Sequence, residues 1–116
     1  MKTFFILLFL FLTIPALATE PTVILDVRTE KEYKEVHIPE VLNIDFYQAD
    51  FKNKIEKLDK AHSYRVYCRS GNRSGKTVSL MKSMGFTKLE NLGSLKEAGE
   101  KLNTKCQDEG GNSIEC

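Results

Sequence analysis

The chain has 116 residues and a formal net charge of +1. Lys2 is the only charged residue before position 19, so residues 19–116 carry 16 basic and 16 acidic side chains. This balance excludes a strongly basic nucleic-acid binder and a polybasic membrane-surface protein. The length suits one small domain with a single core and excludes a large multidomain enzyme.

Residues 1–18 have the pattern of a cleaved secretory signal. A basic start precedes an unbroken apolar run at 4–12, and Ala16-Leu17-Ala18 is the small-x-small sequence that signal peptidase reads. Pro15 interrupts the apolar stretch, which is shorter than the ~20 residues of a membrane-spanning helix. We therefore expect Thr19 to begin the mature protein, a periplasmic or secreted location, and no membrane contact after cleavage.

Short apolar runs and helical patterns alternate through the first half of the remaining chain. Residues 23–27 predict a strand, and Thr29 with Glu32 has the form of a capping box that opens a short helix. A second strand is expected at 41–44. A helical face at the spacing i, i+4, i+7 comes next, formed by Phe51, Ile55 and Leu58.

The second half repeats the alternation. Residues 64–67 predict a strand that ends at Cys68, and the next helix is expected over 73–84, with Gly85 as its left-handed C-cap. A short strand at 88–90 precedes a last helix. That helix is opened by a second capping box, Ser94 with Glu97, and turns Leu95, Ala98 and Leu102 inward.

Strands that alternate with helices predict an α/β fold. We expect a central, mainly parallel sheet of about four to five strands, flanked by helices on both faces. In such sheets the ligand crevice lies beyond the carboxyl ends of the strands. The loop after the strand at 64–67 therefore opens at the edge that bears the site.

The loop at 68–74 concentrates the chemistry. Gly71 and Asn72 are residue types that accept positive φ, which lets successive backbone N–H groups turn inward and bind an anion. The helix terminus and the cations Arg69 and Arg73 favour negative charge at the same point. These features predict a thiolate at the cysteine of the loop, able to attack sulfur or phosphorus. The alternative is a small buried residue that merely ends a strand.

Four ordered segments between residues 23 and 99 resemble the rhodanese (sulfurtransferase) family, and the leader and size are most similar to its single-domain periplasmic members of the phage-shock-protein type. The loop at 68–74 is similar to the family's C-x-x-G-x-R-S active-site pattern. The other similar segments are Asp26-Val27-Arg28 with Glu32-Tyr33, His37-Ile38-Pro39 with Asn43-Ile44, and Met84-Gly85-Phe86 with Asn91-Leu92-Gly93.

The resemblance implies a sulfurtransferase that needs no cofactor. Cys68 would take sulfane sulfur from a small anionic donor such as thiosulfate, become a persulfide, and pass the sulfur to cyanide or a thiol. Asp26 and Arg28 would brace the loop through polar contacts. The substrate-binding residues implied in this way are Arg69, Ser70, Gly71, Asn72, Arg73 and Ser74.

The sequence also departs from the family at several positions. Val36 and Glu40 stand where the family commonly has Gly on either side of its H-I-P segment, and Ser94 replaces a second Gly after Gly93. These changes concern the pocket walls and the substrate preference, not the nucleophile. We expect His37 to be a structural hydrogen-bonding residue.

The three cysteines of the chain divide into one in the loop and two in the tail. Export would place them where disulfides persist, and an odd count leaves one thiol unpaired within a monomer. Gly110-Gly111 allows the chain to turn back, so one expectation is a disulfide between Cys106 and Cys116 with Cys68 free. The other is two reduced thiols in an unstructured tail.

From the leader, the resemblance and the tail, we expect three parts of the chain: a signal at 1–18, a rhodanese-like domain at 19–104 and a tail at 105–116.

Two other functions remain open. Cysteine phosphatases and arsenate reductases use a C-x5-R loop, whereas the loop from Cys68 to Arg73 has the pattern C-x4-R. Because this loop is one residue shorter, it encloses a smaller space, which favours a single sulfur atom over a tetrahedral oxyanion. The loop also fits a noncatalytic persulfide carrier or an interaction module.

We expect no metal site, because His37 and His62 lack ligand spacing with Cys68. We also expect a monomer, because nothing in the pattern demands a partner subunit.

Overall fold

The computed structural model describes residue 10 and residues 20–116. The predicted secretory signal and its cleavage site lie outside the described residues, with the exception of Leu10. Within the described part, no helix combines the length and the apolar character needed to cross a membrane.

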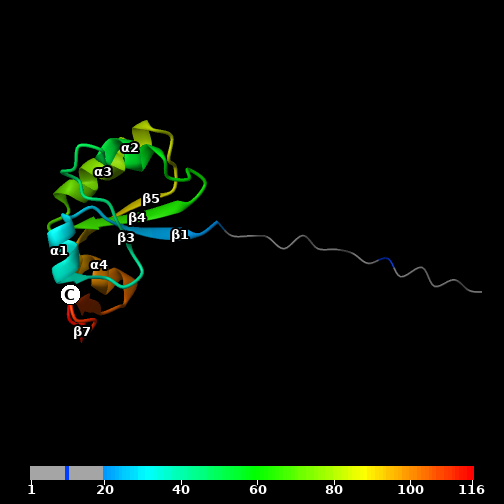
Figure 1. The fold of residues 1–116 in the computed structure, drawn as a ribbon. Helices are drawn as coiled ribbons and strands as arrows, with labels where there is room; N and C mark the ends of the chain where they lie inside the picture. Colours follow the sequence, from blue (N-terminus) through cyan, green and yellow to red (C-terminus); the bar gives the residue numbers. More distant parts are fainter. Residues whose placement is uncertain (1–9, 11–19) are drawn as a thin grey trace, which may run out of the picture.

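A four-stranded parallel sheet forms the centre of the molecule (Figure 1). Its strands are β1 (Thr22–Asp26), β3 (Leu42–Asn43), β4 (Ser63–Cys68) and β5 (Leu89–Ser94). The order is β3-β1-β4-β5, and each neighbouring pair is parallel. The two strands with the clearest apolar runs, β1 and β4, lie in the middle, where both faces of a parallel sheet are covered. The predicted parallel α/β fold is confirmed.

Helices cover both faces of this sheet (Figure 1). The helices α2 (Phe51–Glu56) and α3 (Asn72–Ser83) lie on one side, and α1 (Glu30–Glu35) and α4 (Leu95–Leu102) lie on the other. Alternate residues of the central strands supply two separate cores. The larger core contains residues of α2 and α3 packed on Leu25, Val66 and Cys68. The smaller one contains Tyr67, Leu92 and Ala98 of α4.

Local sequence signals set the helix boundaries. Thr29 accepts a hydrogen bond from the N–H of Glu32, whose side chain returns to the backbone of Thr29, and Ser94 and Glu97 form the same capping box at α4. Gly85 lies just beyond α3 with a φ of 96°, in the left-handed region. Both predicted capping boxes and the predicted C-cap glycine are confirmed.

Two elements differ from the sequence prediction. The strand expected at 88–90 continues to Ser94, because a bulge opposite Val66 and Tyr67 lets a polar, glycine-containing stretch remain paired with β4. The tail forms strands that were not predicted. β2 (Val36–His37), β6 (Cys106–Asp108) and β7 (Ser113–Ile114) make a small antiparallel sheet in the order β2-β6-β7.

A disulfide closes the tail hairpin. It joins Cys106 to Cys116 and leaves Cys68 as the free cysteine. Cys106 is buried in the smaller core, beside Tyr67 and Leu92. The tail is therefore an ordered hairpin attached to β2, in contrast to the alternative of an unstructured tail with two reduced thiols.

Candidate active site

Cys68 is the last residue of β4 and is fully buried at the carboxyl edge of the sheet. The chain then turns into α3 through Gly71, which has a φ of 95°. The backbone angle favours glycine, and a Cβ atom at Gly71 would also make a tight contact of 3.3 Å with the Cα of Gly93. Asn72, expected as a second residue suited to positive φ, instead begins α3, because the turn needs only one left-handed residue.

Hydrogen-bond donors surround the sulfur of Cys68. The N–H of Gly71 donates to Sγ at 3.0 Å, and the Ser74 hydroxyl lies 3.4 Å from it. Burial raises the pKa of this thiol. Hydrogen bonds from the Ser74 hydroxyl and from the backbone N–H groups of Ser74, Ser70 and Gly71 lower it. Their combined effect is larger than that of burial, so the pKa lies below its ordinary value. The loop thus favours an anionic sulfur.

Arg73 is engaged in a contact that the sequence did not reveal. Its Nη1 and Nη2 donate to Oε1 and Oε2 of Glu32 at 2.8 and 3.1 Å, and its guanidinium lies 5.5 Å from the centroid of the Tyr47 ring. The hydrogen bond from Arg73 lowers the pKa of Glu32 to about 2. This ion pair joins the start of α3 to α1 and offsets much of the positive charge that Arg73 brings to the loop.

Arg69 has a different position from Arg73. Its side chain is exposed and lines a hollow of about 360 Å³ that is also bounded by Glu35 of α1, Val36 of β2 and Leu95 of α4. Because Arg69 directly follows Cys68, it is the loop cation best placed to meet an anion arriving from solvent. Ser70 and Asn72 are exposed beside it.

Asp26 and Arg28 form a buried ion pair at the end of β1. Arg28 Nη2 lies 2.8 Å from Asp26 Oδ2 and also donates to the carbonyl oxygen of Val36 at 2.6 Å. The Tyr67 hydroxyl donates to the same carboxylate oxygen at 2.7 Å. Since Tyr67 immediately precedes Cys68, the pair supports the end of β4. Its contacts go to Tyr67 and Val36, so any support of the loop is indirect.

Asn91 of β5 is a further site residue that the sequence did not single out. Its Oδ1 accepts hydrogen bonds from the Ser74 hydroxyl at 2.7 Å and from the N–H of Gly93 at 2.9 Å. Its Nδ2 donates to the carbonyl oxygen of Gly71 at 3.3 Å. The only available signal was its place in the family-like segment at 91–93, which gives no indication of these partners.

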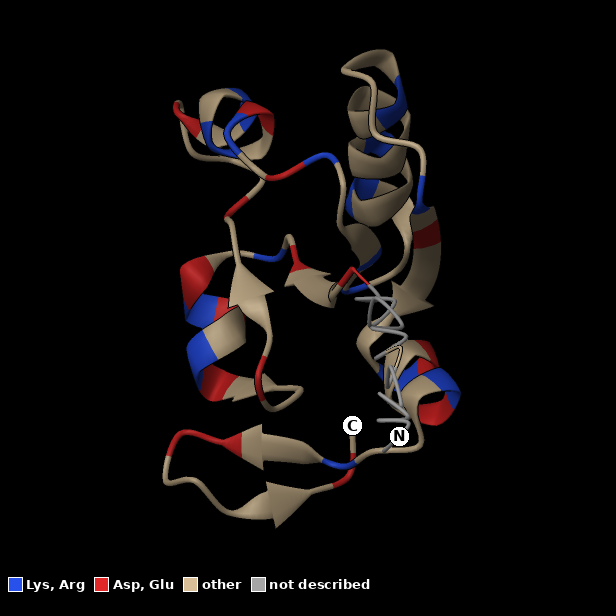
Figure 2. Ribbon diagram, turned by 90° about the vertical axis from the view of Figure 1, so that its right-hand side faces the viewer, with Lys and Arg blue, Asp and Glu red and all other residues tan. Residues whose placement is uncertain are grey.

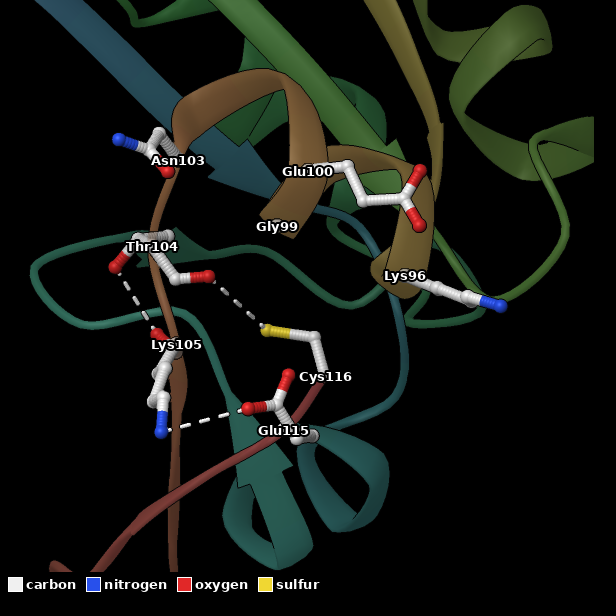
Figure 3. Close-up of a pocket in the computed structure, with 8 residues that line it drawn as sticks. All are labelled: Lys96, Gly99, Glu100, Asn103, Thr104, Lys105, Glu115 and Cys116. Atoms are coloured by element: carbon white, nitrogen blue, oxygen red, sulfur yellow. Dashed lines mark hydrogen bonds and ion pairs between the residues drawn. The ribbon is translucent and has the colours of Figure 1, made fainter.

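A larger hollow lies elsewhere, between α4 and the tail (Figure 3). It has a volume of about 510 Å³, and its walls include Gly99, Thr104 and Cys116, while an ion pair of 3.4 Å joins Lys105 to Glu115 at its rim. None of residues 68–74 lines it. In the described residues, no cluster of three His, Cys, Asp or Glu side chains is placed to hold a metal ion.

The fold and the site define a class of α/β domains that hold a buried cysteine in an amide-lined loop at the carboxyl edge of a parallel sheet. The sequence model of one family in this class, the rhodanese-like domain, matches residues 15–99. The chain belongs to the rhodanese-like sulfurtransferase family.

Individual relatives agree with this assignment. The chain is 31% identical over 85 residues to the thiosulfate sulfurtransferase PspE of Escherichia coli strain K12, an alignment that covers 73% of this chain and 80% of that protein. It is 35% identical over 69 residues to the putative sulfur carrier protein YrkF of Bacillus subtilis strain 168, covering 60% of this chain but only 36% of that longer protein.

Solved structures show the same fold. A rhodanese with anions from E. coli superimposes with a TM-score of 0.57 at 30% identity, covering 66% of this chain and 89% of that one. A rhodanese-like domain of the Alr3790 protein of Anabaena gives a TM-score of 0.64 at 22% identity, covering 77% and 83% of the two chains.

Proposed function

We propose that this protein transfers sulfane sulfur from thiosulfate or a similar small anion to a thiophilic acceptor, through a persulfide on Cys68. The Cys68 thiolate attacks the sulfane sulfur, the S–S bond of the donor breaks, and sulfite leaves with the bonding electrons. Cyanide or a thiolate then attacks the outer sulfur, and Cys68 leaves as a thiolate. No cofactor is needed, because both steps are displacements at sulfur.

The observation that carries this proposal is the hydrogen-bonding environment of the Cys68 sulfur. The N–H of Gly71 at 3.0 Å and the Ser74 hydroxyl at 3.4 Å stabilise negative charge on a sulfur that burial alone would keep protonated. An inward-facing ring of amides also suits the outer sulfur of a persulfide, which is anionic. Arg69 lies where the anionic donor would approach, and we assign it and the loop residues 70–74 to substrate binding.

A noncatalytic sulfur carrier is the second candidate. The relative named a putative sulfur carrier supports it, because a carrier needs the same persulfide-forming loop. The two functions differ in the step after persulfide formation. An enzyme releases sulfur to a small acceptor over many turnovers, whereas a carrier holds it until a partner protein arrives.

We further propose that the protein is exported and acts as a monomer in the periplasm or outside the cell, with no membrane contact after signal cleavage. The leader sequence at 1–18 supports export, and the Cys106–Cys116 disulfide is of the kind that persists in oxidising compartments. The domain would then occupy 19–104, with 105–116 as its disulfide-closed extension.

Thiocyanate production from thiosulfate and cyanide tests the proposal. The wild-type protein and the control Ser79→Ala, an exposed position on α3, should turn over repeatedly, and Cys68→Ser should lose all activity. Retention of activity by Cys68→Ser contradicts the assigned nucleophile. A single transferred sulfur per chain favours the carrier. Hydrolysis of an aryl phosphate that disappears in Cys68→Ser would instead identify a cysteine phosphatase.

A further inference from the structure

The Ser74 hydroxyl has more hydrogen-bond partners than it has hydrogens. It is buried and lies 2.7 Å from Asn91 Oδ1, 3.1 Å from the carbonyl oxygen of Gly71 and 3.4 Å from Cys68 Sγ. A serine hydroxyl donates one hydrogen and accepts through its lone pairs. It can therefore donate to Asn91, to Gly71 or to an anionic sulfur, but to only one of them at a time.

Backbone groups fix the orientation of the Asn91 amide. The N–H of Gly93 lies 2.9 Å from Oδ1 and must donate to an oxygen, whereas the carbonyl oxygen of Gly71 lies 3.3 Å from Nδ2 and must accept from a nitrogen. Turning the amide over would place donor against donor and acceptor against acceptor. Asn91 thus presents an oxygen to Ser74, and the short distance makes that oxygen the preferred acceptor of the Ser74 hydrogen.

This geometry gives two states of the same three side chains. When Cys68 is a thiol, the Ser74 hydrogen points to Asn91, and the Ser74 oxygen is free to accept the S–H of Cys68. When the sulfur is anionic, as a thiolate or as the outer atom of a persulfide, the Ser74 hydrogen must turn away from Asn91 to reach it. The carboxamide of Asn91 therefore competes with the sulfur for one hydrogen.

We propose that Asn91 is a positioning residue that sets, through the Ser74 hydroxyl, how readily Cys68 gives up its proton. The proposal rests on the proposed function in taking Cys68 as the reacting group.

Substitution of Asn91 should leave the charge and position of the other charged groups near the sulfur unchanged, because most of these groups are already paired. They are the exposed cation Arg69 of the loop, the Arg73–Glu32 pair between α3 and α1, and the Asp26–Arg28 pair beside Tyr67. Asn91 is itself solvent-exposed, so a replacement of similar size leaves the packing of the domain intact.

Two isosteric variants with opposite expected effects test the proposal. Asn91→Asp gives Ser74 a stronger acceptor and adds negative charge, so the titration midpoint of Cys68 should rise by about one pH unit, a roughly tenfold smaller thiolate fraction at neutral pH. Asn91→Leu removes the competing acceptor, so the midpoint should fall by about half a unit. Both variants lose the donor to the Gly71 carbonyl, so the opposite signs report the acceptor that is offered to Ser74. The readout is the ultraviolet absorbance of the thiolate against pH, with Cys68→Ser as the blank.

Controls separate this role from a general disturbance of the loop. Asn53→Asp makes the same charge change on the exposed surface of α2 and should leave the midpoint unchanged, and in a Ser74→Ala background Asn91→Leu should have no effect. The proposal would be overturned if Asn91→Asp and Asn91→Leu shifted the midpoint of Cys68 in the same direction, or if neither variant shifted it. An effect of Asn91→Leu that persists without the Ser74 hydroxyl would also overturn it. If Asn91→Leu does not fold, Asn91→Ala replaces it with the same expectation. Because no sulfur donor is present, failure here is distinct from failure of the sulfurtransferase proposal.

Discussion

The proton affinity of Cys68 results from two opposing effects on one atom. Full burial favours the neutral thiol, while the N–H of Gly71 and the hydroxyl of Ser74 favour the thiolate, and the second effect is larger. The loop sequence predicted such donors because Gly71 permits the turn that directs amides inward. The charge of Arg73 contributes less than the sequence suggested, since Glu32 pairs with it.

The Arg73–Glu32 pair makes a testable contribution to stability. Glu32→Gln keeps the capping box with Thr29, because glutamine also serves at that position, but removes the charge opposite Arg73. We expect it to lower the free energy of unfolding near neutral pH by about 0.5–1 kcal/mol, since the pair is partly exposed.

The pH dependence of that loss arises from the lowered pKa of Glu32. A carboxyl group whose pKa is lower in the folded state contributes its full stability above the unfolded value of about 4.5 and loses it as the pH falls toward about 2. The difference between wild type and Glu32→Gln should therefore shrink between pH 4.5 and 2 in chemical denaturation. A difference that stays constant across that window contradicts the assigned pair.

Individual residues also mark the limit of what the sequence could predict about the site. Cys68, Gly71 and Ser74 share one loop, so their proximity was readable from order along the chain. Arg73 and Glu32 are 41 positions apart, as are Tyr67 and Asp26, and Asn91 reaches Ser74 across 17 positions. Such pairs depend on strand order and register, which local patterns do not determine.

Among the elements, the turn between β2 and β3 carries an unfavourable residue. Glu40 has a φ of 61°, in the region that favours glycine. Glu40→Gly should relieve this conformation and raise the free energy of unfolding by up to about 1 kcal/mol, after the larger entropy of glycine in the unfolded chain is allowed for. Glu40→Ala, which keeps a Cβ atom, is the matched control and should show no such gain in thermal denaturation. Equal effects of both substitutions count against backbone strain as the cause.

The tail hairpin is an element with a link to the active site. β6 pairs with β2, the carbonyl of Val36 in β2 accepts from Arg28, and Arg28 holds Asp26 beside Tyr67. The hairpin also packs closely on α4, where a Cβ atom at Gly99 would lie 2.8 Å from the sulfur of Cys116. The tail thus supports the side of the sheet that α1 and α4 cover.

Replacing both tail cysteines by serine should destabilise this element. We expect a loss of about 2–3 kcal/mol, the size typical of a disulfide that closes a short loop. Hydrogen exchange of the backbone amides should accelerate most in β2 and β6, and less in β4, which is held by both of its parallel neighbours. Uniform acceleration in all strands would show that the disulfide acts on the whole domain and not on the hairpin.

The elements that the sequence predicted and those it missed differ in length and patterning. The strands β1 and β4 are apolar runs, and α1 and α4 begin with capping boxes, so local signals sufficed. The strands β2, β6 and β7 have two or three residues each and no clear alternation. The strands β6 and β7 form because the Cys106–Cys116 disulfide and the pairing of β6 with β2 hold them. The sequence offered the disulfide as one expectation, but the pairing with β2 has no local pattern.

Residues 19–116 carry no net charge but divide their charged side chains unevenly between two regions (Figure 2). Residues 45–90, which include α2 and α3, carry ten Lys and Arg and five Asp and Glu, whereas the rest of 20–116 carries six and eleven. The loop at 68–74 belongs to the basic region. Its field should therefore attract a small anion, although the net charge of residues 19–116 is zero.

Salt dependence of the reaction tests this charge division. With thiosulfate as the donor, kcat/KM should fall several-fold between about 10 and 300 mM ionic strength, because salt screens the attraction of the loop for an anion. Arg69→Gln should weaken that dependence. If kcat/KM of Arg69→Gln depended on ionic strength as strongly as that of the wild type, the attraction would arise from the basic region as a whole. A wild-type kcat/KM that does not depend on salt would contradict electrostatic attraction of the donor.

The most direct test of the proposed sulfur transfer is mass spectrometry of the Cys68 peptide after treatment of the purified protein with thiosulfate. The peptide should gain the mass of one sulfur atom and lose it again on addition of cyanide, while the Cys106–Cys116 disulfide stays unmodified. A Cys68 peptide of unchanged mass, or sulfur recovered only on the tail cysteines, would contradict the proposed persulfide and with it the account of the site.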